Sequence, residues 1–195
     1  MIHPDTEVRF ISPEIGYGVV ATKFIPKGTI TWVQDELDRV FTREESNALS
    51  PYIRTYLDTY CFTNKYGEKV LCWDNGKFVN HSFKPSCFST SYDFEIAIRD
   101  IYPGEELTDD YGYLNVEKPF EAADEGTDRK IVYPDDLVTF HKDWDELVKQ
   151  HIPYIFEVPQ PMRQLITDEK WQVFEKLRKE PSQMISLLEC YYKAI

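Results

Sequence analysis

The chain has 195 residues, 42 % of them hydrophobic and 15 % aromatic, so it is long enough to bury one sizeable core and a smaller appended lobe. Its net charge is −12, and no part of it has the basic surface that a nucleic-acid backbone requires, which favours a cationic partner over a nucleic acid. The N-terminal residues do not resemble a targeting signal, and no stretch approaches the roughly 20 apolar residues of a membrane span. We therefore expect a cytoplasmic protein without membrane contact, or a nuclear one if the source is a eukaryote.

Up to about residue 116, turn residues divide the sequence into short extended pieces. The sequence Pro26-Lys27-Gly28 predicts a tight turn between strands over residues 19–24 and 29–33, which are rich in β-branched and aromatic side chains. This pattern is typical of a mainly β body.

A second strand signal lies over residues 94–99. Apolar residues alternate with polar ones there, and the polar set includes Glu95 and Arg99, so the segment predicts a half-buried strand with these two residues on its polar face. Pro103 and Gly104 follow at the two central positions of a type II turn.

Residues 42–62 interrupt the β pattern with a helical one. Thr42 and Glu45 have the spacing of a capping box, and tyrosines recur every four residues after them. We interpret this segment as a small helical insertion in the β body.

Residues 117–195 differ from the rest in composition. A polar linker is followed by helical patterns over residues 134–152, 167–180 and 182–195. The predicted organisation is thus a domain over residues 1–116 and a linker with a helical extension over residues 117–195, whose helices could also mediate oligomer formation.

The four cysteines are far apart and include no CxxC pair. This spacing indicates neither a zinc site nor a small disulfide framework, so we expect reduced thiols and no zinc.

Three short stretches carry the functional signal. They are "GYG" at residues 16–18, "NHSFKPSC" at residues 80–87 and "GEELTDDYG" at residues 104–112. Their order and spacing resemble the SET domain, a family of protein lysine methyltransferases that use S-adenosylmethionine. The resemblance covers residues 7 to about 116. Because no zinc-binding cysteine cluster flanks this range and it ends in "DDYGYLN", the sequence resembles most the small stand-alone SET proteins of bacteria.

The resemblance implies a mainly β fold, a SET-type β-clip, in which the segment after "GEEL" threads under the "NHS" loop and forms a pseudoknot. It implies that Tyr111 is the catalytic tyrosine, with its hydroxyl at the methyl-transfer centre. It also implies that S-adenosylmethionine contacts Gly16, Tyr17, Gly18, Asn80, His81, Tyr111 and Phe120.

Each of these stretches also has an alternative structural interpretation. The glycines at residues 16 and 18 could form a simple hairpin turn. The residues around Asn80 could satisfy their own backbone in a loop, and Tyr111 and Phe120 could be ordinary core aromatics.

Three positions depart from the pattern that the family implies for the substrate channel. Asp109 stands where an aromatic residue is usual, Ser89 replaces a common tyrosine, and Gln34 aligns with another tyrosine. Asp109 either faces the channel on the same side as Tyr111 or turns away to pair with a surface base. Asp110 is then expected on the opposite face.

The remaining acidic residues of this stretch suggested a metal site as an alternative. Glu105 and Glu106 are expected to be solvated in the turn, and no histidine supplements them in sequence, so we expect no calcium or magnesium site.

The sequence therefore favours an S-adenosylmethionine-dependent protein lysine N-methyltransferase that acts on a basic, lysine-containing protein. Two alternatives stay open because the channel residues are altered. One is a non-catalytic SET-like module that binds a basic partner, and the other is methylation of a small amine or of a residue other than lysine.

Overall fold

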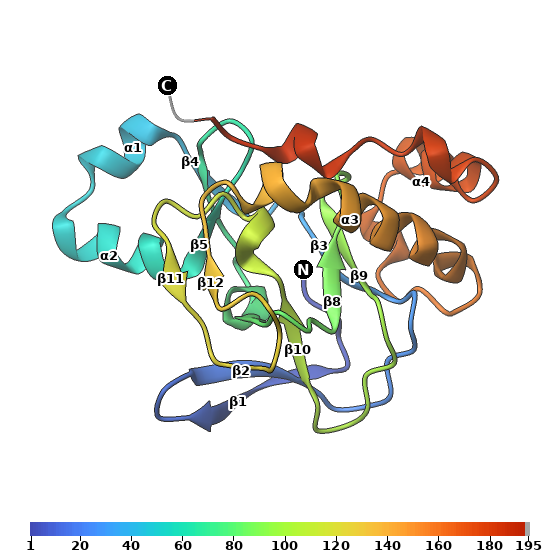
Figure 1. The fold of residues 1–195 in the computed structure, drawn as a ribbon, viewed down its shortest axis with the longest axis horizontal. Coiled ribbons are helices and arrows are strands. Elements are labelled where there is room, and N and C mark those ends of the chain that lie inside the picture. Colours follow the sequence, from blue (N-terminus) through green and yellow to red (C-terminus); the bar gives the residue numbers. More distant parts are fainter. Residues whose placement is uncertain (194–195) are drawn as a thin grey trace.

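The computed structural model describes residues 1–193 of the 195-residue chain. Short strands form the body of the protein, and the helices lie around it (Figure 1). The mainly β fold with a helical insertion and C-terminal helices is as predicted.

The first sheet contains four strands. Its order is β1 (Thr6–Ser12), β2 (Gly16–Ala21), β10 (Glu106–Asp109) and β7 (Asn80–His81). β10 runs antiparallel to β2 and parallel to β7, so it is hydrogen-bonded between two strands that are far from it in sequence.

The loop after β7 closes over β10. The backbone N–H of Ser82 donates to the carbonyl of Asp109 at 2.9 Å, and that of Ser86 donates to the carbonyl of Thr108 at 3.2 Å. The Thr108 N–H donates to the Ser86 hydroxyl at 2.9 Å. The loop over residues 82–86 is therefore hydrogen-bonded to β10 at both of its ends. This is the contact expected if β10 passes under the "NHS" loop.

Two further three-stranded sheets and one two-stranded ribbon complete the β structure. One sheet has the order β3 (Ile30–Val33), β9 (Phe94–Ala97) and β8 (Cys87–Ser89), and another has the order β4 (Arg39–Phe41), β6 (Lys69–Leu71) and β5 (Cys61–Thr63). The ribbon pairs β11 (Phe120–Glu121) with β12 (Ile131–Val132).

The predicted insertion forms two helices, α1 (Arg43–Ala48) and α2 (Pro51–Tyr60). Thr42 and Glu45 make the predicted capping box, and Ser50 caps α2 with Pro51 in its first turn. Pro51 has no N–H to continue α1, which is why the insertion is two helices and not one.

The turn before β10 has the predicted geometry. The Glu105 N–H donates to the Tyr102 carbonyl at 2.9 Å, and Gly104 has a φ of +91°, the left-handed value that the third position of a type II turn requires.

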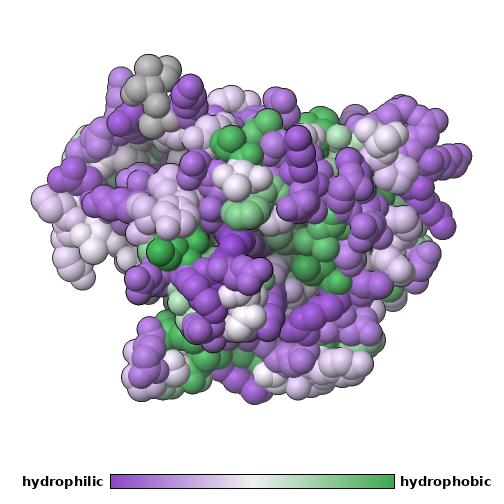
Figure 2. Space-filling view, in the orientation of Figure 1, coloured by the Kyte–Doolittle hydropathy of each residue, from purple (hydrophilic) through white to green (hydrophobic). Residues whose placement is uncertain are grey.

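The C-terminal helices α3 (Asp136–His151) and α4 (Asp168–Leu177) pack on the same core as β3, β8 and β9. Leu137, Trp144 and Val148 form the buried stripe of α3. Figure 1 shows α3 running across one side of the strands. Hydrophilic residues cover most of the face seen in Figure 2, with apolar side chains gathered in a few places.

The helix predicted over residues 182–195 does not form in the described part of the segment, and residues 194–195 lie outside that part. Residues 181–183 and 187–190 form single 3₁₀ turns. The Leu187 N–H donates to the Asp145 carboxylate on α3 at 2.8 Å, and Leu187 itself is buried. Tertiary contacts with α3 thus replace a regular helix here. Within residues 1–193, no helix has the length and apolar character needed to cross a membrane.

Candidate active site

The three sequence motifs meet in the first sheet. "GYG" begins β2, "NHS" contains β7, and "GEELTDDYG" contains β10, which lies between the other two. Segments up to about 90 residues apart in the chain therefore form one continuous surface.

The corner at Gly18 is tightly packed. The Asn80 amide donates to the Tyr17 carbonyl at 3.0 Å and to the Glu106 carboxylate at 2.7 Å. A Cβ on Gly18 would collide with that carboxylate and lie 2.9 Å from the Asn80 amide nitrogen. Glu106 is therefore half-buried and hydrogen-bonded at this corner, which corrects the prediction that it is solvated in a turn; Glu105 does lie on the surface, beside Arg99.

The other residues of the "GYG" stretch leave space around the corner. Gly16 has a φ of +84°, and nothing lies within 4 Å of the position that a Cβ would take there. Tyr17 is exposed, with its ring in edge contact with Phe10 and Phe78.

His81 lies in an aromatic setting. Its ring centroid is 4.4 Å from that of Phe83, 5.5 Å from that of Tyr111 and 5.6 Å from that of Phe120. Its Nδ1 accepts a 3.1 Å hydrogen bond from the Tyr111 N–H, while its Nε2 is buried without a partner among the described residues. Burial lowers the pKa of His81, so the ring is neutral at neutral pH.

Tyr111 lies in the 3₁₀ turn that follows β10. Its hydroxyl donates to the Val79 carbonyl, next to the "NHS" stretch. Burial, and then the nearby carboxyl groups of Asp109 and Glu95, raise the pKa of Tyr111 well above its ordinary value. The side chain is therefore a neutral phenol with a fixed hydroxyl direction.

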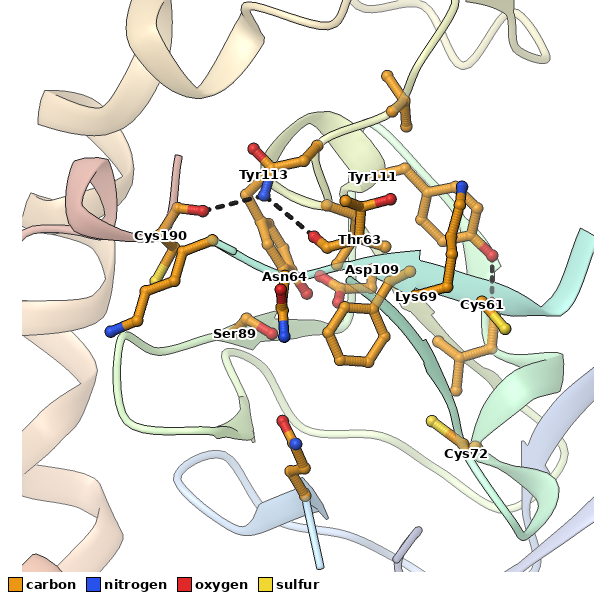
Figure 3. Close-up of a pocket in the computed structure, with 18 of the residues that line it drawn as sticks. Cys61, Thr63, Asn64, Lys69, Cys72, Ser89, Asp109, Tyr111, Tyr113 and Cys190 are labelled. Atoms are coloured by element: carbon orange, nitrogen blue, oxygen red, sulfur yellow. Dashed lines mark hydrogen bonds between the residues drawn. The ribbon is translucent and has the colours of Figure 1, made fainter. Parts of the chain in front are cut away.

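A cavity of about 840 Å³ opens beside Tyr111 (Figure 3). The three predicted channel residues, Gln34, Ser89 and Asp109, all line it, and so do Tyr111 and Phe120. Gly16, Tyr17, Gly18, Asn80 and His81 do not line it. Tyr111 therefore connects the surface formed by the motifs with the cavity.

Asp109 faces this cavity with a second acidic residue that the sequence did not single out. Asp109 is only 2 % exposed, and its Oδ1 accepts a 2.8 Å hydrogen bond from the Asp110 N–H. Glu95 lines the same cavity, close enough for its charge to act on Asp109. Burial is the main reason that the pKa values of both groups are raised, and the Glu95 charge raises that of Asp109 further.

Glu95 was predicted on the polar, outward face of its strand. That face instead turns toward the cavity, where the hydroxyls of Ser89 and Tyr113 donate to Glu95 Oε1 at 3.5 Å each. Glu95 lies opposite Ser89 in the β8–β9 hairpin. The sequence could have identified Glu95 through this pairing. Ser89 was already predicted to line the channel, and the residue opposite it on the neighbouring strand shares its face of the sheet.

Asp110 points away from the cavity but is also buried. It forms an ion pair with Arg129, which is also paired with Asp136 at the start of α3 at 2.5 Å. Asp110 Oδ1 accepts the Gly112 N–H at 2.9 Å and so caps the turn that holds Tyr111. The C-terminal segment thereby supports the turn through Arg129.

All four cysteines are free. Burial raises the pKa of Cys61 to about 11 and that of Cys87 to about 12, so these groups are thiols at neutral pH. No group of three potential metal ligands occurs in the part of the chain that the structure describes.

The buried Asp109 carboxyl lowers the free energy of unfolding at neutral pH. Its folded-state pKa is raised above the unfolded value, so its contribution to stability is greatest at acid pH and is lost as the pH rises. We expect Asp109→Asn to raise the free energy of unfolding by about 1 kcal/mol or more at pH 7.5, because a difference of one pKa unit between the folded and unfolded states corresponds to about 1.4 kcal/mol.

At pH 4 the wild-type carboxyl is protonated in the folded state, and we expect the difference from Asp109→Asn to shrink toward zero. Urea unfolding at the two pH values measures this. A gain in stability that is equal at both values would show that Asp109 does not titrate as its surroundings require.

Comparison with known proteins places these residues in a family. A family model of the SET domain matches residues 16–112, a range that holds all three motifs. A solved structure from Plasmodium falciparum, assigned as a histone methyltransferase, is similar at 21 % identity with a TM-score of 0.41, over 56 % of this chain and 95 % of the other. No curated protein matches the chain.

Proposed function

We propose that this protein, a member of the SET-domain family through residues 16–112, transfers a methyl group from S-adenosylmethionine to a lysine side chain of a protein. Members of this family are, in general, S-adenosylmethionine-dependent methyltransferases. The observation that carries the proposal is the position of Tyr111, whose backbone binds the "NHS" histidine while its side chain lines an 840 Å³ cavity.

The surface formed by the three motifs on β2, β7 and β10 suits S-adenosylmethionine, a nucleoside that carries a positively charged sulfur. Because Gly18 has no side chain, a ligand can approach its backbone; any Cβ at this position would displace Asn80 and Glu106. The Glu106 carboxylate offers a negative charge, and the buried Nε2 of His81 offers an unused hydrogen-bonding position. The Phe120 ring near His81 gives an apolar surface for a base.

S-adenosylmethionine would supply an electrophilic methyl group on a positively charged sulfur. Gly16, Tyr17, Gly18, Asn80, His81 and Phe120 would hold it, with Tyr111 beside the methyl group. The chain's own contribution is to position the acceptor amine and exclude water, since positioning accounts for much of the rate in such transfers.

Tyr111 has the catalytic role in this proposal. Its hydroxyl proton is directed to the Val79 carbonyl, which leaves the oxygen lone pairs for weak CH···O contacts with a methyl group. Since the pKa of Tyr111 is raised, the hydroxyl stays neutral and does not compete as a nucleophile.

The cavity would receive the lysine. Gln34, Ser89 and Asp109 would form the substrate channel, and the carboxyl groups of Asp109 and Glu95 suit a basic, lysine-containing protein. No nucleic acid or membrane enters this proposal, self-association through the C-terminal helices remains a prediction, and we place the activity in the cytoplasm, or in the nucleus of a eukaryote.

The same carboxyl groups also favour a second candidate function. Asp109 and Glu95 could hold a small amine or another basic group, which would then be methylated or simply bound without turnover. Cofactor binding and label transfer separate these cases.

Calorimetric titration with S-adenosylmethionine tests the proposal first. We expect saturable binding at one site, weakened at least tenfold by Asn80→Ala, because the Asn80 side chain organises the Gly18 corner. Asn75→Ala is the matched control, since Asn75 is exposed and lies outside the motifs. No heat of binding from the folded wild-type protein would refute methyl transfer.

Incubation with a lysate and methyl-labelled cofactor tests the acceptor. We expect label on lysine residues of basic proteins. Label found only on small amines would favour the second candidate, and cofactor binding without any label would favour a binding module.

A further inference from the structure

One negative charge in the cavity has no positive partner. Asp109 and Glu95 line the same cavity, and neither belongs to an ion pair within residues 1–193. Two carboxyl groups that share one buried site cannot both ionise at low cost, so one of them keeps its proton and the pair carries one negative charge. We call these two side chains the carboxyl pair.

No charged group among the described residues forms an ion pair with the carboxyl pair. Four lysines line the same cavity, and none of them is paired with Asp109 or Glu95; they are Lys65, Lys69, Lys77 and Lys118. Burial raises the pKa values of Tyr111, Cys72 and Cys87, which keeps all three neutral at neutral pH. Asp110 lies behind the pair and is bound to Arg129. The N-terminal amino group, whose charge acts on Glu95, is bound to Asp35 at 2.8 Å.

The Asp109 side chain is only 2 % exposed, yet it lines a cavity large enough for a ligand. A buried carboxyl without a cation is unfavourable unless a ligand supplies one. The carboxyl pair is thus a preformed binding site for a positively charged group beside Tyr111.

Resting on the proposed function, we propose that the carboxyl pair is the receptor for the ε-ammonium group of the substrate lysine and takes up its proton before methyl transfer. Asp109 and Glu95 thereby act as catalytic residues in addition to Tyr111. The amine must lose a proton to become a nucleophile, and free lysine titrates near 10.4, far above neutral pH.

The proton step balances without another reactant. One N–H bond of the ammonium breaks, and one O–H bond forms on the ionised carboxylate of the pair. A group of charge +1 and a pair of charge −1 become a neutral amine and two neutral carboxyl groups, so the cavity holds no separated charge afterwards. The pair is restored when it loses one proton to solvent.

The chemistry selects a primary ammonium over two other cations. A guanidinium does not give up a proton at any relevant pH, so arginine would be bound without being activated. A divalent metal would require a third ligand, and no cluster of three such residues occurs among residues 1–193.

Binding of a lysine probe to the protein without cofactor tests the proposal. The probe is Nα-acetyl-lysine amide, and its neutral counterpart is Nα-acetyl-norleucine amide, which lacks only the amino group. We expect the wild-type protein to bind the lysine probe at least tenfold more tightly. Asp109→Asn with Glu95→Gln should reduce that preference to less than threefold.

The matched control removes the same two charges elsewhere. Asp143→Asn with Glu175→Gln changes exposed carboxylates on α3 and α4 and should keep the tenfold preference. If the control loses the preference as well, or if the folded cavity variant keeps it, the receptor role is overturned.

Infrared difference spectra of the wild-type protein test the proton step without any variant. We expect the absorption of protonated carboxyl groups to increase when the lysine probe binds, and to stay constant with the norleucine probe. An unchanged carboxyl band despite binding overturns the proton transfer. Because no cofactor is present in these measurements, failure to bind S-adenosylmethionine would count against the proposed function alone.

Discussion

Replacing Tyr111 with phenylalanine is expected to lower the rate of methyl transfer by roughly 100-fold, the size of effect typical for removing one preorganised polar group from a transition state. The hydroxyl is the only part that changes. It is held by the Val79 carbonyl, and the Tyr111 side chain lines the cavity, where cofactor and amine would meet. Affinity for S-adenosylmethionine should change by less than about threefold, because the ring and the backbone contact remain.

The control for this prediction is Tyr102→Phe. Tyr102 is 56 % exposed, and its hydroxyl makes no hydrogen bond to the described residues. Initial rates with labelled cofactor should match the wild type for Tyr102→Phe. Tyr111→Phe also removes the hydrogen bond to Val79, worth about 1 kcal/mol, so urea unfolding must accompany the rates. Label transfer unaffected by Tyr111→Phe would remove Tyr111 from the catalytic role.

Replacing Arg129 with methionine is expected to cost about 3 to 5 kcal/mol of stability, the range found when one member of a buried ion pair is removed. Arg129 binds both Asp110 and Asp136, whose side chains are 4 % and 5 % exposed. Its guanidinium also lies 4.7 Å from the ring centroids of Phe83 and Phe140. Without it, two buried carboxylates lose their cation and the turn at Tyr111 loses its support.

Urea unfolding at pH 7.5 measures this cost. Arg99→Met is the matched control, because Arg99 pairs with Glu105 on the surface, where such pairs contribute about 1 kcal/mol or less. Adding Asp110→Asn and Asp136→Asn to Arg129→Met should recover part of the loss, since the unpaired charges disappear. A cost below about 1 kcal/mol for Arg129→Met would mean that water compensates the two carboxylates.

The local features of the fold were predictable because short-range chemistry determines them. The capping box at Thr42 and Glu45, the turn at Pro103 and Gly104 and the apolar stripe of α3 all depend on residues within a few positions of each other. The helix predicted over residues 182–195 is wrong for the described residues 182–193, because the 3₁₀ turn at residues 187–190 depends on a hydrogen bond to Asp145, 42 residues away.

Some residues of the candidate site could be identified from the sequence, and others only from the structure. The three motifs and Tyr111 could be located from their order in the chain, although their roles remain predictions. Glu95 could not, because alternation shows which residues share a face of β9 but not what covers that face. Much of the rest of the cavity wall comes from residues 58–69 and 109–118, which the chain brings together only on folding.

The order of the residues thus determined the family, the strand and helix signals and the catalytic candidate, since these rest on local patterns and on motif spacing. Only the tertiary structure decided that Asp109 and Glu95 line one cavity and that Asp110 pairs with Arg129. The physical reason is that burial and charge pairing are properties of surroundings, and β10 obtains its surroundings from strands and loops far away in sequence.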